Sequence, residues 1–269
     1  MKILIFILLF AKIPCLNNFI LAQEIPNEFF SYKFKKIIND TGLNWKRITT
    51  FGPIREVFYD SLRYDSLKIK TRLGLSSCND DFAIYGYEHL SFQKYFYSFL
   101  YARIVTDPNS FSRFSGIPQE VERSGFTSGE TDLSGIGFEN SWSILQIGRG
   151  RQSWGAGNDI QLALSEISPS YDYHLIGLNL NRLRYRYFHS FLESDSIGVN
   201  RYLAARGIEY SNLKSLVISL SEIVIYSGIN RPADLTYLNP ISSHLEIELN
   251  DRQNVVGTDN ANAVWQASL

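Results

Sequence analysis

The feature that most constrains the fold is a segment, residues 181–192, whose side chains change character with a period of two. In an extended chain successive side chains point to opposite faces. One face of this segment then carries Leu183, Tyr185, Tyr187 and Phe191, and the other carries Arg182, Arg184 and Arg186. A helix would scatter the three arginines around its circumference. The pattern predicts a strand between lipid and a wet lumen, as in a transmembrane barrel. A half-exposed strand of a soluble β-protein is the alternative.

The same alternation occurs again near residue 70 and predicts a second strand of this kind. Leu67, Ile69, Thr71 and Leu73 alternate with Lys68, Lys70 and Arg72. We expect further strands at residues 82–87, 92–105, 138–147 and 213–226, because these are apolar and aromatic segments separated by turn residues. The fold class is therefore predicted to be all-β, an antiparallel transmembrane β-barrel.

Two details of the predicted strands concern polar residues. Residues 107–134 are polar and rich in Gly, Ser and Pro, so we expect a long loop at the mouth of the barrel. Glu222 falls among the apolar residues of segment 213–226. We expect either a β-bulge at this residue or a position near the membrane interface, because an acid facing lipid is costly.

The N-terminus predicts export. Residues 1–22 combine a positive start, an apolar core and a small residue at position 22, as in a signal peptide. Residues 23–44 show helical spacing and are predicted to form a helical segment outside the sheet. Residues 45–269 are then predicted to form the barrel. The formal net charge of the whole chain is −1, and removal of Lys2 and Lys12 leaves it mildly negative, so nucleic acid is not expected as a partner.

A stretch of unusual composition, residues 148–158, contains four glycines, Arg149, Arg151 and Trp154. Glycine permits close backbone approach, while arginine and the indole supply donors and a stacking face. Two interpretations are open. The stretch contacts a ligand, or it forms a tight bend into the lumen held by salt bridges of the two arginines.

Signals for catalysis are weak. His89, His174, His189 and His244 are isolated from one another, and the sequence contains neither a zinc-binding H-E-x-x-H nor a G-x-S-x-G nucleophile motif. Acids such as Glu130, which could cleave glycosidic bonds in pairs, fall in the predicted loop. We therefore expect a protein that is not an enzyme and binds no metal or cofactor.

Several blocks of sequence, in order, resemble the capsule assembly Wzi family of outer-membrane β-barrels. They are GR at 148–149, SWGAG at 153–157, LALS at 162–165 and PSYDY at 169–173, with SGIGFEN at 134–140 before them and NRYLAAR at 200–206, SEIVIY at 221–226 and YLNPI at 237–241 after them. The resemblance implies a barrel with a helical periplasmic N-terminus and a role in holding or assembling surface polysaccharide. Barrels of this family are larger than the roughly eight to ten strands that this length allows. We therefore expect an incomplete or open barrel.

The functional prediction that follows is a polysaccharide-associated barrel in the outer membrane, in contact with membrane lipid. We expect loop aromatics to stack on sugar faces, and basic side chains facing the lumen to attract an acidic glycan. Those side chains are Arg149, Arg151, Arg182, Arg184, Arg186, Lys68, Lys70 and Arg72, together with Trp154 as an aromatic contact. Two alternatives are a diffusion porin, which needs an open lumen, and a barrel hydrolase that combines His, Ser and an acid from different strands.

Overall fold

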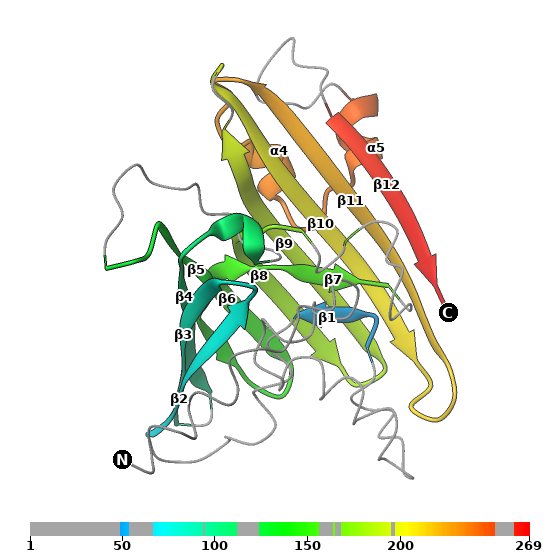
Figure 1. Ribbon diagram of the computed structural model, residues 1–269. Helices are drawn as coiled ribbons and strands as arrows, with labels where there is room; N and C mark the ends of the chain where they lie inside the picture. Colours follow the sequence, from blue (N-terminus) through cyan, green and yellow to red (C-terminus); the bar gives the residue numbers. More distant parts are fainter. Residues whose placement is uncertain are drawn as a thin grey trace.

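The computed structural model describes residues 49–53, 67–93, 95–111, 124–155, 164, 168–194, 197–250 and 261–269. The predicted signal peptide and the predicted N-terminal helical segment lie outside these residues. Ten strands form one antiparallel sheet in the order β12-β11-β10-β9-β8-β6-β5-β4-β3-β2, which is open at β2 and β12 (Figure 1). The prediction of an antiparallel all-β fold with an open sheet is confirmed.

The strands of the large sheet are 8 to 13 residues long. Their bounds are β2 Lys68–Cys78, β3 Asp81–Phe92, β4 Phe96–Val105, β5 Ser128–Glu139, β6 Ser143–Gly150, β8 Tyr171–Leu180, β9 Leu183–Ser194, β10 Val199–Ser211, β11 Val217–Ile229 and β12 Ala261–Ser268. A short 3-10 helix, η2 (Pro108–Ser110), follows β4, and two helices, α4 (Leu235–Leu238) and α5 (His244–Leu249), lie between β11 and β12.

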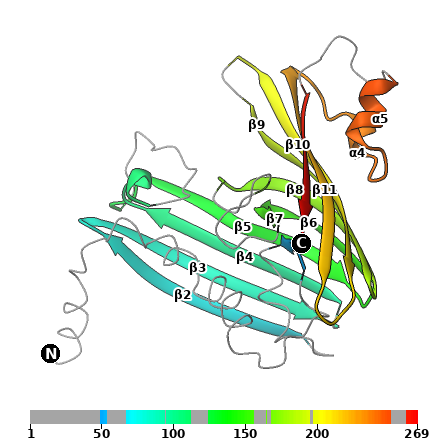
Figure 2. The same cartoon turned by 90° about the vertical axis from the view of Figure 1, so that its right-hand side faces the viewer.

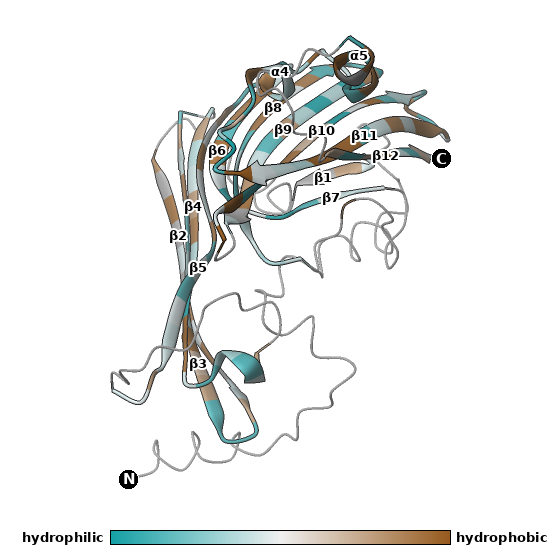
Figure 3. Cartoon of the chain, turned by 90° about the horizontal axis from the view of Figure 1, so that it is seen from above, coloured by the Kyte–Doolittle hydropathy of each residue, from teal (hydrophilic) through white to brown (hydrophobic). Residues whose placement is uncertain are grey.

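The sheet is strongly curved, and a different element packs on part of each face. On its concave side lie β1 (Phe51–Pro53) and β7 (Gln152–Trp154), which pair with each other as a separate two-stranded ribbon (Figures 2 and 3). Helices α4 and α5 lie on the convex side.

The convex face carries a band of exposed apolar side chains. The cross-strand register and the two-residue period place on this face at least one such residue from every strand of the large sheet. They include Leu73 on β2, Ile84 on β3, Ile104 on β4, Ile136 on β5, Ile147 on β6, Leu180 on β8, Leu183 on β9, Ile208 on β10, Leu220 on β11 and Trp265 on β12. We call this set the convex band.

The connections between strands differ in length at the two ends of the sheet. One end, the short-turn end, has only the short connections 93–95, 140–142, 181–182 and 212–216. The other end, the long-connection end, has the connections 106–127, 151–170 and 230–260, besides the short ones at 79–80 and 195–198. Side chains fix the short turns: Asn212 Oδ1, for example, accepts the backbone N–H groups of Lys214, Ser215 and Leu216 at 2.8–2.9 Å.

Several predicted boundaries are wrong. The predicted strand 213–226 begins within the turn 212–216, since β11 starts at Val217, and the predicted strand 82–87 is too short, since β3 continues to Phe92. Residues 92–105 contain a turn at 93–95, where Gln93 adopts a φ of 50° without any glycine or proline to mark it. Residues 138–147 include the turn 140–142, where Asn140 Oδ1 accepts the backbone N–H groups of Trp142 and Ser143 at 2.9 and 2.7 Å. The predicted loop 107–134 ends earlier than expected, since β5 begins at Ser128.

Candidate functional site

The ribbon of β1 and β7 is the central feature of the concave face. The chain leaves the sheet after Gly150, and β7 then pairs in register with β1, with Phe51 opposite Trp154. The ribbon is extended by two further backbone bonds, from Gly155 N–H to the Thr50 carbonyl at 2.8 Å and from Trp154 N–H to the Leu164 carbonyl at 3.1 Å. The predicted bend into the concave side is therefore present in residues 148–155, the part of the stretch that the structure describes, and of the two arginines only Arg151 forms its ion pair on that side.

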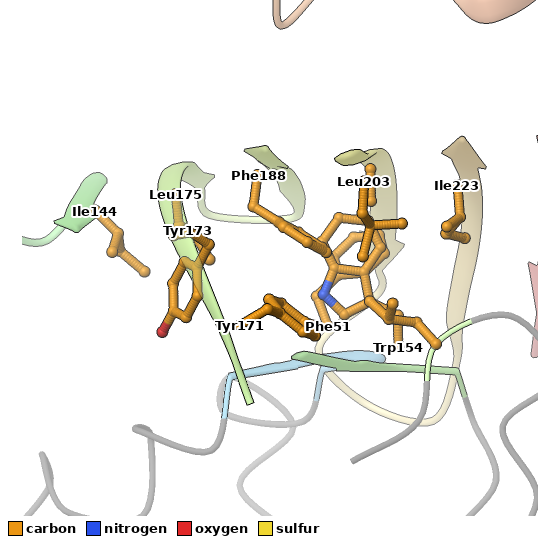
Figure 4. Close-up of a cluster of buried hydrophobic side chains, with 11 residues drawn as sticks. Phe51, Ile144, Trp154, Tyr171, Tyr173, Leu175, Phe188, Leu203 and Ile223 are labelled. Atoms are coloured by element: carbon orange, nitrogen blue, oxygen red, sulfur yellow. The ribbon is translucent and has the colours of Figure 1, made fainter. Parts of the chain in front are cut away.

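An aromatic cluster fills the space between the ribbon and the sheet (Figure 4). Trp154 is fully buried, with ring centroids 4.8 Å from Phe51 and 5.3 Å from Phe188, the latter at an interplanar angle of 83°. The Phe51 ring rests on Gly207 of β10, where a Cβ atom would lie only 2.5 Å from it. The buried members of the cluster are Phe51, Ile144, Trp154, Leu164, Tyr171, Tyr173, Leu175, Phe188, Leu203, Ala205 and Ile223.

A buried group of two acids and two arginines holds the bend in the chain. A register shift between Tyr101 and Ala102 leaves Asp132 as an extra residue of β5. Such a bulge can turn a side chain toward the inside. Asp132 Oδ1 accepts from Arg151 Nη2 at 2.5 Å and from Arg103 Nη2 at 3.3 Å, and Arg103 also pairs with Glu130. The charges of this group are thereby largely neutralised within the protein.

A second ion pair anchors the other strand of the ribbon. Arg184 Nη1 donates to Glu209 Oε1 at 2.5 Å. Glu209 Oε2 accepts the backbone N–H of Thr50 at 2.5 Å and the hydroxyl groups of Thr50 and Thr49 at 2.8 and 3.1 Å. This one carboxylate therefore links β9, β10 and the residues that lead into β1.

A row of three polar side chains, one each from β4, β6 and β8, runs across the concave face and passes over β5. The Tyr97 hydroxyl donates to Gln146 Oε1 at 2.8 Å, and Gln146 Nε2 donates to the Tyr173 hydroxyl. All three side chains are buried. These three polar groups are thus bonded to one another across the sheet, as burial requires of polar side chains.

The structure brings together only some of the residues predicted to face the lumen. Arg151, Trp154, Arg184 and Arg186 lie on the concave face and are buried. Arg151 and Arg184 are held by carboxylates, as described above, and Arg186 Nη1 donates to the backbone carbonyls of Leu178 and Tyr185 at 3.2 and 3.0 Å.

The remaining predicted residues lie elsewhere. Arg149 is on the convex face, where it pairs with Asp172 at 3.3 Å and donates to the Thr131 carbonyl. The prediction that Arg149 faces inward is therefore wrong, because the chain bends between it and Arg151. Arg182 is exposed in the turn between β8 and β9. Lys68, Lys70 and Arg72 belong to β2 with the register of the concave face, but their side chains lie outside what the structure describes.

The acids of the concave face are the residues that sequence reasoning missed. Glu130 and Asp132 were expected to be solvated in a loop, yet both lie in β5 and pair with arginines. The sequence around Glu209 gave no indication that this residue forms an ion pair. Its position on β10 opposite Arg184 depends on the strand register, which a single sequence does not reveal.

The convex face has a second buried assembly beneath α4 and α5. Glu222 faces this side with no register shift between β10 and β11, so the first of the two alternatives, a β-bulge, is wrong. It pairs with Arg206 at 3.4 Å and accepts the backbone N–H of His244 at 3.0 Å. The rings of Tyr202, Tyr226 and Tyr237 stack at centroid distances of 4.9 and 4.4 Å.

Among the described residues, no group of three or more His, Cys, Asp or Glu side chains is arranged to hold a metal ion. No helix within the same ranges has the length and apolar character needed to cross a membrane. Comparisons with family models, with curated proteins and with solved structures each found no match. The class of protein that the structure defines is thus an all-β protein built on one curved, open antiparallel sheet.

Proposed function

We propose that this chain forms the wall of an outer-membrane β-barrel that takes part in the assembly or surface attachment of a polysaccharide. The observation that carries the membrane part of this proposal is the convex band. Leu73 is 79% exposed and Ile147 is 66% exposed, and the band extends over all ten strands. Soluble monomers rarely expose contiguous apolar patches larger than a few hundred Å², whereas a barrel wall requires one that faces lipid.

The distribution of connections supports the same proposal. In outer-membrane barrels short turns face the periplasm and longer loops face the outside. The short-turn end and the long-connection end of this sheet have that asymmetry. The long-connection end is then the cell-surface end, and the polysaccharide is proposed to meet the protein there.

The packed concave face favours a polysaccharide role over a diffusion porin. A porin needs a wet passage along the inside of its wall, but here the ribbon and the aromatic cluster cover the central part of that face. Because Arg151 and Arg184 are held by acids, the proposal does not depend on an open basic lumen. The polysaccharide as partner rests on the resemblance to the capsule assembly Wzi family.

The test is deletion of the gene in a host that carries it and displays a surface polysaccharide. We expect cell-associated polysaccharide to fall and polysaccharide in the medium to rise, and the wild-type gene to restore retention. Immunoblots of the outer-membrane fraction control for abundance of the complementing protein. Unchanged retention in the deletion strain would refute the polysaccharide role, and a large steady conductance of the purified protein in planar bilayers would favour a porin.

A further inference from the structure

The segment 235–249, which contains α4 and α5, is fastened to the convex face by polar bonds. The Tyr187 hydroxyl donates to the Tyr237 carbonyl at 2.9 Å, and the Tyr185 hydroxyl donates to the Pro240 carbonyl. Together with the bond from His244 N–H to Glu222, these contacts attach the segment at three points along its length. Its orientation against the sheet is therefore fixed.

One side of this segment packs on the sheet and the other side is bare. Tyr237 and Ile247 are fully buried in a cluster with Ala204, Val224 and Tyr226. The large apolar residues of the bare side are Leu235, Ile241, Leu245 and Leu249, which are all exposed. Ile241, at 86%, has the greatest exposure of any large apolar residue that the structure describes.

The exposed side adjoins the convex band. Pro240 is bonded to Tyr185, whose cross-strand neighbour on β10 is Ile208, and Ile208 in turn lies opposite Leu220 on β11. Ile208 and Leu220 are both exposed members of the band. The connection between α4 and α5, with Ile241 at its tip, therefore lies at the border between the covered and the bare parts of this face.

The segment also covers a charged pair that would otherwise face lipid. Arg206 and Glu222 are on the convex side, yet they are only 7% and 2% exposed. An ion pair left bare in hydrocarbon is costly, and a charge on the lipid face of a barrel destabilises it by about 2–4 kcal/mol near the midplane. The cover begins at this pair, about halfway along β10 and β11, and continues over Tyr202, Ala204, Val224 and Tyr226 toward the long-connection end.

We propose that residues 235–249 form a lipid anchor, which inserts Ile241 and its exposed apolar neighbours into the lipid beside the wall. Amphipathic helices likewise place their apolar side against acyl chains. The anchor presents an apolar surface to lipid where it covers Arg206 and Glu222. It rests on the proposed function only in that the convex band must face lipid.

The experiment is photocrosslinking of the full chain in vesicles of phosphatidylethanolamine and phosphatidylglycerol. Three single variants are compared, Ile241→p-benzoylphenylalanine, Ile208→p-benzoylphenylalanine in the convex band and Asn250→p-benzoylphenylalanine at an exposed polar position just after α5. Lipid adducts are measured by mass spectrometry. We expect adducts at positions 208 and 241, with a yield at 241 severalfold higher than at 250.

The outcomes separate the anchor from the proposed function. Lipid adducts at 208 but not at 241, or equal yields at 241 and 250, would overturn the anchor and leave the barrel wall intact. Crosslinks from 241 to a protein instead of lipid would also overturn it. The absence of lipid adducts at 208 as well as 241 would overturn both proposals.

Discussion

At the scale of single residues, Asp132 is central to the concave face because it pairs with two arginines. Its carboxylate is fully buried between Arg103 and Arg151, and it faces inward because the strand bulges at this position. Removing one partner of a buried ion pair leaves an uncompensated charge in a poorly solvated place. The bulge and the ion pairs thus depend on one another.

We expect Asp132→Asn to lower the free energy of unfolding by about 3–5 kcal/mol, the range for a broken buried ion pair. The matched control is Asp172→Asn, which removes the pair with Arg149 on the convex face, where the Asp172 side chain is 67% exposed. This pair lies next to the long-connection end, at the end of β6 and the start of β8, and ion pairs exposed to water contribute about 0–1 kcal/mol. Urea titrations followed by tryptophan fluorescence measure the free energy of unfolding of both variants. Equal losses of free energy would show that the ion pairs of Asp132 do not stabilise the fold more than an exposed pair does.

The sequence predicts that the arginines of the concave face attract an acidic glycan. In the structure Arg151 and Arg184 instead form ion pairs with carboxylates of the protein itself. Arg151 and Trp154 are both buried beneath or within the ribbon. A triple replacement of Arg149, Arg151 and Trp154 would therefore disturb folding, and a loss of polysaccharide retention in that variant would not identify a glycan site. Substitutions at exposed positions of the long-connection end are the better probe.

At the scale of elements, the ribbon of β1 and β7 packs on β10 at a glycine. Phe51 from β1 lies against Gly207, which leaves no room for a side chain. The ribbon has few residues of its own, so its attachment depends on the aromatic cluster and on the bonds to Glu209. The close contact at Gly207 sets how near the ribbon approaches the sheet.

We expect Gly207→Val to destabilise the protein by about 1–3 kcal/mol, the usual cost of overpacking. Phe51→Ala alone removes a large buried ring and should cost about 3–5 kcal/mol. Because the two side chains occupy the same space, the double variant should cost less than the sum of the single variants. Additive losses in chemical unfolding would contradict the contact. Gly86→Ala serves as the control, since its Cβ would meet Leu73 at an ordinary 3.4 Å.

At the scale of the whole molecule, the two faces of the sheet have opposite environments. The concave face is packed by its own ribbon, while most of the convex face is apolar and bare apart from the segment 235–249. The curve of the sheet, with its long connections gathered at one end, is the arrangement of a barrel wall (Figure 2). The proposed membrane location follows from these properties together and not from any single strand.

We expect Ile147→Lys to impair insertion of the protein into vesicles, because a lysine on the lipid face costs about 2–4 kcal/mol near the bilayer midplane. Ser141→Lys, in the exposed turn between β5 and β6, places the same charge in water and should insert like the wild type. Flotation of vesicles with bound protein measures insertion. Equal insertion of the two variants would show that the convex band does not contact lipid.

The sequence by itself determined the class of fold and the two-sided character of the strands. The alternation in residues 181–192 predicts which side chains of β9 share a face, and Arg184 and Arg186 do lie on one side with Leu183 on the other. This succeeds because the direction of a side chain along a strand is a property of the local backbone.

Only the tertiary structure decided what those side chains touch. Arg149 and Arg151 are two residues apart and would share a face in a continuous strand, but the chain leaves the sheet after Gly150 and they end on opposite sides. The partners Asp132 and Glu209, and the cover that 235–249 provides for Glu222, depend on register, a bulge and a long connection. Contacts between residues far apart in sequence follow from how the whole chain packs, and for that reason the local pattern could not specify them.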